Sequence, residues 1–260
     1  MTIISCARFG ERAGIVTGAA SGIGRATALR LAAEGAAVAV ADRREEDAAN
    51  TVKEIRAAGG SAIAIGCDVS DEPQVAALVA RSAQAFGRLD FLANVAGITT
   101  NPKKHIDETS TEEFEQILSV NLKGTFLGMK HVIPLMKPRR YGRIVNVASI
   151  AAFLGLNAGN APYGASKGGV IALTRQAVSE VSSFGITVNA VAPGIIRTAM
   201  NEQYGEEWRE KTGQRIPLGH VGKAEDMAAA IAFLLSDDAA YVTGHMLTVD
   251  GGLTSSLHRG

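Results

Sequence analysis

Short segments that are apolar at almost every position alternate along this 260-residue chain with longer stretches of helical periodicity. A strand without polar positions must be covered on both faces, which parallel sheets achieve because their crossover helices lie on the faces. The alternation therefore predicts an α/β fold, a doubly wound parallel sheet of about seven strands with helices on both faces. The expected strands are Gly14–Thr17, Ala36–Ala41, Ser61–Cys67, Leu89–Asn94, Gly142–Ala148, Ile186–Val191 and Met246–Val249.

The length favours a single domain over residues 1–260, because one α/β domain commonly reaches this size. Ligands of doubly wound sheets bind beyond the carboxyl ends of the strands, so polar residues and glycines at those ends are the candidates for a site. The expected helices are Ile23–Ala33, Arg44–Ala57, Asp71–Phe86, Thr111–Met136, Pro162–Val181 and Ala224–Leu235.

The composition argues against several classes of protein. The 26 Lys and Arg residues balance 26 Asp and Glu residues, so the charge expected of a nucleic-acid binder is missing. No apolar run approaches the roughly 18 residues that span a bilayer. The two cysteines, Cys6 and Cys67, and five scattered histidines provide neither a disulfide framework nor metal-ligand spacing, so no metal is expected. Because Met1–Gly10 lacks a signal-peptide pattern, the expected location is cytoplasmic.

A glycine-rich segment, Thr17–Gly24, follows the first expected strand and opens the first expected helix. Glycines there allow a tight turn and let a pyrophosphate approach the free N–H groups of the helix. An ordinary glycine turn is the alternative, because the spacing is Gly-x-x-x-Gly-x-Gly and not Gly-x-Gly-x-x-Gly. The expected cofactor contacts in this segment are Gly18, Ser21, Gly22, Ile23 and Gly24.

Asp42 ends the second expected strand, 18 residues after Gly24, near the position where an acid binds an adenosine ribose. A carboxylate there accepts hydrogen bonds from both ribose hydroxyls and repels a 2′-phosphate, which favours NAD. Capping of the charged helix that follows is the alternative role. Arg43 and Arg44 keep NADP open as the less favoured cofactor, because guanidinium groups bind phosphate well.

Three further residues suggest proton-transfer chemistry. Tyr163 and Lys167 are spaced i,i+4 on an expected helix and share one face. A tyrosine pKa of about 10 is too high for a base at neutral pH, but a nearby ammonium favours the phenolate. Ser149 follows a strand and can donate a hydrogen bond to a substrate carbonyl. Taken singly, a surface Tyr–Lys pair and a turn serine remain the alternatives.

The ordered set resembles the short-chain dehydrogenase/reductase family, and the match runs nearly end to end. The resemblance implies a Rossmann-like fold and a nicotinamide cofactor. The motifs that carry it are Thr17–Gly24, Cys67-Asp68-Val69, Asn94-Val95-Ala96-Gly97, Asn121, Ser149, Tyr163-x-x-x-Lys167, Pro193-Gly194 with Thr198, and Val249-Asp250-Gly251-Gly252.

By resemblance, Tyr163 is the general acid or base, and Lys167 lowers the Tyr163 pKa and binds the nicotinamide ribose. Ser149 orients the substrate oxygen, and Asn121 helps to hold a water that relays protons from Lys167. Asp68 contacts the adenine. The further cofactor contacts that the resemblance implies are Val69, Asn94, Ala96, Gly97, Tyr163, Lys167, Pro193, Gly194, Ile196 and Thr198.

The substrate region departs from the family pattern. Ser149 and Tyr163 are 14 residues apart, where the family commonly has 13, and the extra residue falls within Phe153–Pro162. A segment at about 199–217 resembles the family's substrate lid. Apolar side chains there and opposite suggest a modest, mainly apolar substrate with a secondary alcohol or ketone, although core packing is the alternative. These substrate candidates are Phe153, Leu154, Leu156, Met200, Tyr204 and Trp208.

Three functions are open on the sequence. The favoured one is an NAD-dependent oxidoreductase of secondary alcohols and ketones, and the second is an NADPH-dependent reductase of 3-oxoacyl thioesters on acyl carrier protein. The third, a dinucleotide-binding regulator without catalysis, is disfavoured because all four catalytic positions are filled. The resemblance also implies a homotetramer built on the helices near 111–136 and 162–181 and on the C-terminal region, where Gly164, Gly168 and Gly169 allow close approach. Neither nucleic acid nor membrane is an expected partner.

Overall fold

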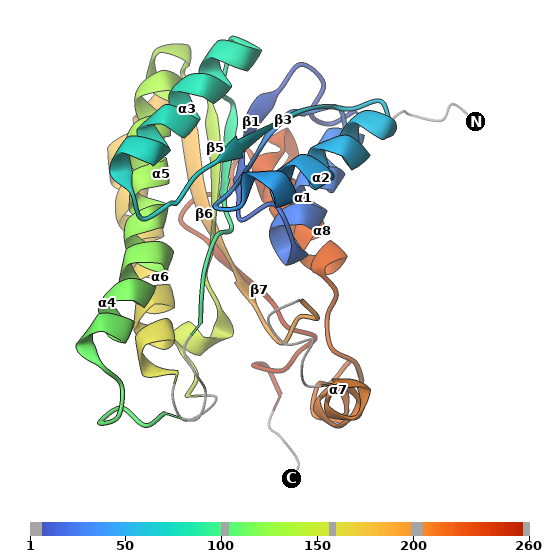
Figure 1. The fold of residues 1–260 in the computed structure, drawn as a ribbon, viewed down its shortest axis with the longest axis vertical. Coiled ribbons are helices and arrows are strands. Elements are labelled where there is room, and N and C mark those ends of the chain that lie inside the picture. The colour runs from blue at the N-terminus through green and yellow to red at the C-terminus, as the bar shows by residue number, and fades with distance from the viewer. Residues whose placement is uncertain (1–6, 100–103, 156–159, 199–204, 257–260) are drawn as a thin grey trace.

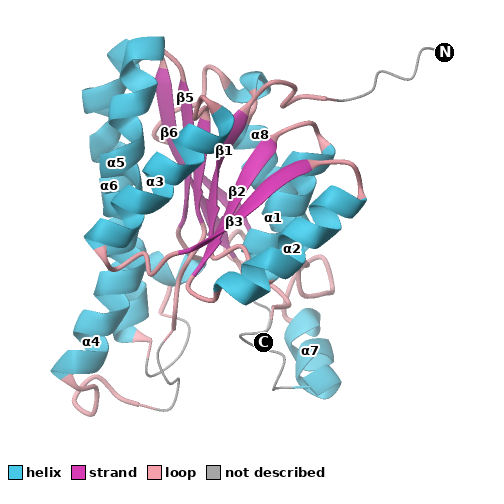
Figure 2. Cartoon of the chain, turned by 45° about the horizontal axis from the view of Figure 1, so that its top comes forward, coloured by secondary structure: helices cyan, strands magenta, loops and turns pink. Residues whose placement is uncertain are grey.

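The computed structural model describes residues 7–99, 104–155, 160–198 and 205–256. One sheet of seven parallel strands crosses the molecule (Figures 1 and 2). The strands are β1 (Ala13–Thr17), β2 (Ala37–Asp42), β3 (Ser61–Gly66), β4 (Phe91–Asn94), β5 (Gly142–Val147), β6 (Ile186–Pro193) and β7 (Met246–Val249). Their order, β3-β2-β1-β4-β5-β6-β7, reverses direction between β1 and β4, which confirms the doubly wound α/β fold.

The helices of the described residues are α1 (Gly22–Ala33), α2 (Glu45–Ala57), α3 (Glu72–Phe86), α4 (Thr111–Leu118), α5 (Gly124–Met136), α6 (Ala161–Val181), α7 (Gly205–Gln214) and α8 (Ala224–Leu235). Helices α1, α2 and α8 cover one face of the sheet, and α3, α5 and α6 cover the other (Figure 1). Every residue of the central strands β1, β4, β5 and β6 is buried, as their apolar sequences require. None of these helices is long and apolar enough to cross a membrane.

The sequence predicted the elements of the sheet and its flanking helices to within two residues at each end, because strong local signals mark many of the boundaries. Helix α3 is an example. Asp71 caps its start by accepting a hydrogen bond from the Gln74 N–H at 3.2 Å, and Gly87 ends it with a left-handed φ of 70°.

The helix expected over Thr111–Met136 is divided into α4 and α5 by a π-helical turn at Ser119–Lys123. The Gly124 N–H donates to the carbonyl of Ser119, five residues back, so the turn holds one residue more than an α-helical turn. Apolar periodicity does not reveal a single extra residue within a continuous helical pattern. The turn contains Asn121, which is completely buried.

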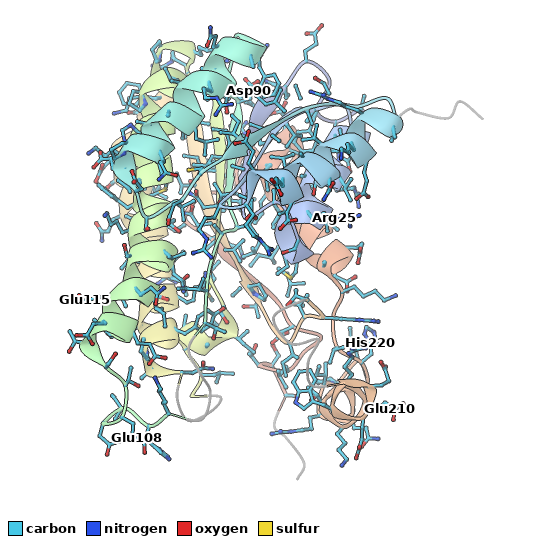
Figure 3. All side chains as sticks on the ribbon, viewed as in Figure 1. Arg25, Asp90, Glu108, Glu115, Glu210 and His220 are labelled. Carbon is cyan, nitrogen blue, oxygen red and sulfur yellow. The ribbon has the colours of Figure 1, made fainter. Side chains whose placement is uncertain are left out.

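A buried carboxylate, Asp90, binds several groups at the amino ends of the strands. Asp90 is 1% exposed and receives two hydrogen bonds from Arg88 at 2.7 and 2.8 Å, one from Arg139 at 3.1 Å and one from the Ala13 N–H at 2.9 Å. Figure 3 shows Asp90 at the end of the molecule opposite His220, which lies beside α7. This ionic cluster is therefore remote from the carboxyl ends of the strands, where the candidate site lies.

Candidate active site

The turn between β1 and α1 has a backbone that only glycine adopts without strain. Gly18 and Gly22 have φ angles of 64° and 52°, in the left-handed region. A Cβ atom at Gly18 would lie 2.7 Å from the Cα of Ala96, and one at Gly24 would lie 2.1 Å from the Gly18 oxygen. The Ser21 side chain makes no capping bond to α1, so the first-turn N–H groups remain for an anion. The turn thus fits the pyrophosphate of a dinucleotide.

A cleft of about 290 Å³ opens beyond the carboxyl ends of the strands around β1. Asp42 faces this cleft from the end of β2, and its two oxygens accept hydrogen bonds from the Ala20 and Arg44 N–H groups, both at 3.2 Å. The Arg44 guanidinium is paired with Asp47 at 2.8 Å. The lining residues are Gly18, Ser21, Asp42, Arg43, Arg44, Cys67, Asp68, Val69, Ala96, Gly97, Ile98 and Val120.

Cys67 and Asp68, which follow β3, contribute a protonated thiol and a carboxylate to the cleft. The Ser70 hydroxyl and N–H both bond to Asp68 Oδ1, at 2.6 and 2.9 Å, and these bonds lower the pKa of the Asp68 carboxyl. The pKa of the Cys67 thiol is raised to about 11, mainly by burial and to a smaller extent by the negative charges of Asp68 and Asp71. Cys67 is therefore a wall residue and not a nucleophile at neutral pH.

The loop after β4 is fixed by Thr17, which opens the glycine-rich segment but was not among the expected cofactor contacts. Thr17 Oγ1 accepts hydrogen bonds from the Val95 and Ala96 N–H groups at 3.1 and 3.2 Å, which holds this loop against the end of β1. The position of Thr17, directly before the glycine turn, was the available signal.

Asn94 was expected among the cofactor contacts, but its side chain points into the core. It is 3% exposed and donates to Asn146 Oδ1 at 2.8 Å and to the Thr125 carbonyl at 3.4 Å. Asn146 in turn donates to Thr174 Oγ1 at 3.0 Å. These amides and the hydroxyl need buried partners and find them in one another, so the chain of bonds joins β4, β5 and α6 beneath the cleft.

Ser149, Tyr163 and Lys167 come together as predicted. Ser149 follows β5 and is hydrogen-bonded to the Tyr163 side chain, while its Oγ also accepts from the Ala151 N–H at 3.1 Å. Lys167 lies one turn of α6 beyond Tyr163, with Nζ 5.7 Å from the centre of the tyrosine ring. Lys167 Nζ donates to the carbonyl of Val147 at 2.7 Å. A phenol, a hydroxyl and an ammonium therefore meet at the end of β5.

The pKa of the Tyr163 phenol differs from the expectation that Lys167 lowers it. Burial raises this pKa above its ordinary value, and the hydrogen bond with Ser149 acts in the opposite direction but is the smaller effect. Burial also lowers the pKa of the Lys167 ammonium from 10.5 to about 8. Burial thus moves the two pKa values apart from the ordinary 10.0 of tyrosine and 10.5 of lysine, because it disfavours the charged form of each group.

Asn121 lies within reach of this group, and its side chain bonds to Ile98 and Ser166. Its Oδ1 accepts from the Ile98 N–H at 2.8 Å, and its Nδ2 donates to the Ile98 carbonyl at 2.9 Å and to Ser166 Oγ at 3.0 Å. Both amide hydrogens are therefore engaged inside the protein. The side chain positions the cleft wall at Ile98, and the sequence identified neither Ile98 nor Ser166 as a partner.

The segment after β6 runs beside β7 and the glycine turn. Gly194 donates its N–H to the Val249 carbonyl at 2.9 Å, directly after Pro193 at the strand end. The Thr198 methyl group lies near Gly22, 3.4 Å from where a Cβ would be.

Ile23 and Ile196 were both expected to contact the cofactor, but their side chains pack against the core cluster between the sheet and α1, α2 and α8. Ile196 is only 7% exposed. Any contact of Ile196 with a cofactor must therefore use the backbone.

The substrate candidates are only partly placed. Phe153 and Leu154 are 46% and 36% exposed after the turn that follows Ser149, and Trp208 is half-buried on α7. A separate cavity of about 510 Å³ beside α7 is lined by several charged residues, Glu210 among them, and by His220 (Figure 3). Three candidates lie outside the described residues: Leu156, Met200 and Tyr204.

Comparison with known proteins agrees with this geometry. A family model described as enoyl-(acyl carrier protein) reductase matches residues 18–254, which cover the glycine turn, the cleft and the Ser–Tyr–Lys group. The chain belongs to the short-chain dehydrogenase/reductase family. Members of this family are oxidoreductases that use a nicotinamide cofactor, and the chain is such an enzyme.

Relatives within the family have different substrates in their names. The 3-oxoacyl-(acyl-carrier-protein) reductase FabG of Thermotoga maritima is 43% identical over 239 residues, 92% of this chain and 96% of that protein. The cis-4-hydroxycyclohexanecarboxylate dehydrogenase of Sinomonas cyclohexanicum is 42% identical over 247 residues, 95% of this chain and 98% of that protein. The crystal structure of levodione reductase superposes with a TM-score of 0.89 at 37% identity, covering 96% of this chain and 100% of that chain.

Proposed function

We propose that this short-chain dehydrogenase/reductase interconverts a secondary alcohol and a ketone with NAD(H), using Tyr163 as general acid and base. The observation that carries the proposal is the meeting of Tyr163 with Ser149 and Lys167 at the end of β5, beside a cleft that fits a dinucleotide. The fold alone would not suffice, because doubly wound sheets support many activities.

In this proposal the bound nicotinamide supplies or accepts the hydride. In the reducing direction Tyr163 gives its phenolic proton to the carbonyl oxygen, and in the oxidising direction the phenolate removes the hydroxyl proton. Ser149 hydrogen-bonds to the same oxygen and stabilises the charge that develops on it. Lys167, held by Val147, offers its remaining hydrogens to the nicotinamide ribose.

The choice of NAD rests on Asp42. Backbone N–H groups of Ala20 and Arg44 bind its two oxygens and fix the carboxylate at the cleft, where it can accept from two ribose hydroxyls. The pairing of Arg44 with Asp47 also counts against a 2′-phosphate, because this guanidinium already has a carboxylate partner. Asp68 and the backbone around Gly97 are proposed to contact the adenine and the adjoining ribose from the opposite wall.

Reduction of 3-oxoacyl thioesters with NADPH is the second candidate. Two observations favour it: Arg43 lines the same cleft as Asp42, and FabG proteins of two bacterial species are among the relatives. The two candidates share the chemistry of Tyr163 and differ in the cofactor and in the acyl group.

We further propose that the segment at about 199–217, which includes α7, is the substrate lid, with Phe153 on the opposite side. A homotetramer built on the helices near 111–136 and 162–181 and on the C-terminal region belongs to the same proposal. Phe126 on α5 is 46% exposed and would be covered in such an assembly. Light scattering of the purified protein tests this, since a monomeric mass would contradict it.

The first experiment is a titration with NADH and, separately, NADPH, followed by nicotinamide fluorescence, on the wild type, Asp42→Ala and Arg43→Ala. We expect the wild type to bind NADH more tightly and Asp42→Ala to lose this preference. Tighter binding of NADPH, weakened in Arg43→Ala, would support the second candidate instead.

The second experiment measures turnover on a panel of secondary alcohols and ketones that includes cis-4-hydroxycyclohexanecarboxylate, cyclic diketones and acetoacetyl-CoA. Tyr163→Phe removes the proton carrier and is expected to lower kcat at least about hundredfold while nucleotide binding stays near normal. A Tyr163→Phe variant with wild-type turnover would contradict the proposed function.

A further inference from the structure

Ser166, on α6, bonds both to the helix that carries Tyr163 and Lys167 and to the π-helical turn that carries Asn121. It lies between Tyr163 and Lys167 in the sequence and is completely buried. Its Oγ donates to the Tyr163 carbonyl at 2.7 Å and accepts from Asn121 Nδ2 at 3.0 Å. One hydroxyl thus links the helix of the proposed acid–base pair to the π-turn.

The direction of these bonds is fixed by the chemistry of the groups. A serine hydroxyl has a single hydrogen, which the Tyr163 carbonyl receives, so only a lone pair of Oγ faces Asn121. A lone pair accepts from the NH₂ side of the amide and repels its oxygen. Ser166 therefore favours the one amide orientation in which Oδ1 accepts from the Ile98 N–H and Nδ2 donates to the Ile98 carbonyl.

That orientation determines where the cleft wall lies. Ile98 and Gly97 both line the cleft, and Gly97 packs between Asn121 and Lys167. A Cβ at Gly97 would lie 3.2 Å from Asn121 Oδ1 and 3.3 Å from Lys167 Nζ. A rotation of the Asn121 amide would release Ile98 and let the wall shift against the lysine.

We propose that Ser166 is a positioning residue for hydride transfer, which orients Asn121 and, through it, the Gly97–Ile98 wall beside Lys167. The inference deepens the proposed function and rests on it. Ser166 itself touches neither substrate nor cofactor in this proposal, and the polar neighbour through which it acts is Asn121.

The chain offers a matched control in Ser82. This serine is also completely buried in a helix, and its Oγ donates to the Leu78 carbonyl at 2.7 Å, as Ser166 Oγ donates to a carbonyl of its own helix. Ser82 is on α3, away from the cleft lining. Ser166→Ala and Ser82→Ala therefore remove equivalent helix bonds, and only the first also removes an acceptor from Asn121.

The experiment compares kcat, KM and the Kd for NADH of these variants, using the panel compound that the wild type turns over fastest. For Ser166→Ala we expect kcat to fall about tenfold, because a buried amide donor loses its acceptor. The Kd for NADH should rise by a smaller factor than kcat falls, since the wall at Gly97 shifts but Asp42 and the glycine turn are untouched. Ser82→Ala should keep the wild-type kcat, while its thermal stability should fall by about as much as that of Ser166→Ala. Ser166→Cys, which retains a weak acceptor, should recover part of the loss.

A double-mutant cycle with Asn121→Ala shows whether Ser166 acts through the amide. We expect Ser166→Ala to lower kcat little further once Asn121 has been replaced. Losses that multiply in the double variant, an unchanged kcat in Ser166→Ala, or an equal loss in Ser82→Ala would each overturn the positioning role. A wild type inactive on the whole panel, or an active Tyr163→Phe, would instead overturn the proposed function and the role of Ser166 with it.

Discussion

Replacing Lys167 by methionine should make the protein more stable and inactive. Burial lowers the pKa of this ammonium from 10.5 to about 8, and at about 1.4 kcal/mol per pH unit the charged form costs about 3 kcal/mol near pH 7. The hydrogen bond from Lys167 to the Val147 carbonyl returns about 1–2 kcal/mol of this. Methionine fills a similar volume without a charge, so Lys167→Met should gain about 1–2 kcal/mol in the free energy of unfolding at pH 7.

The pH dependence makes the prediction specific to the buried charge. Between pH 8 and pH 10.5 the unfolded chain binds a proton on Lys167 that the folded protein does not, so the stability of the wild type rises with pH in this window. Below pH 8 both states are protonated and the penalty is constant. The advantage of Lys167→Met should therefore shrink by about 2 kcal/mol between pH 7 and pH 10.

Urea unfolding followed by circular dichroism at pH 7, 8.5 and 10, at one protein concentration, measures this difference. Other titrating groups are shared by both proteins and cancel in the comparison. Lys53→Met, at an exposed lysine, is the control and should show neither the gain nor its pH dependence. A Lys167→Met variant that is less stable at pH 7, or whose advantage does not change with pH, would refute the reasoning.

Three further outcomes follow from the described contacts. Gly18→Ala places a Cβ at 2.7 Å from the Ala96 backbone at a φ of 64°, so it should weaken NADH binding at least about tenfold in a fluorescence titration, and wild-type affinity would contradict this. Asp90→Ala leaves the buried Ala13 N–H without its acceptor far from the cleft, and should lower stability by about 1–3 kcal/mol in urea while kcat per folded molecule is kept. Because burial raises the pKa of Tyr163, the phenolate is scarce at neutral pH, so alcohol oxidation in a pH–rate profile should rise towards alkaline pH; a rate that is flat or falls above pH 7 would argue against Tyr163 as the base.

The sheet could be predicted from the sequence because its signals are local. Fully apolar runs such as that of β5 mark strands that are buried on both faces, and residues such as Asp71 and Gly87 mark helix ends. The left-handed backbone at Gly18 is also a local property of the chain. The rules of parallel crossovers then restrict the strand orders that the sheet can have, and the order itself comes from the structure.

The parts that could not be predicted depend on contacts between distant segments. Whether Asn94 faces the cleft or the core is decided by Asn146, 52 residues away, and no pattern around Asn94 reports it. The raised pKa of Tyr163 depends on how the whole site excludes water, which spacing does not convey. The link from Asn121 to Ser166 requires the π-turn to be known first.

The π-turn at Ser119–Lys123 has a consequence for how this chain can change in length. Each residue turns a helix by about 100°, so deletion of one residue from the turn would restore a regular helix but rotate α4 by that angle against α5. Asn121 would then leave the side of the helix that meets Ile98. A one-residue deletion here would leave every helical hydrogen bond available, yet it would detach the cleft wall at Ile98 from the helix that holds it. A one-residue deletion in an exposed loop would be accommodated by the loop itself.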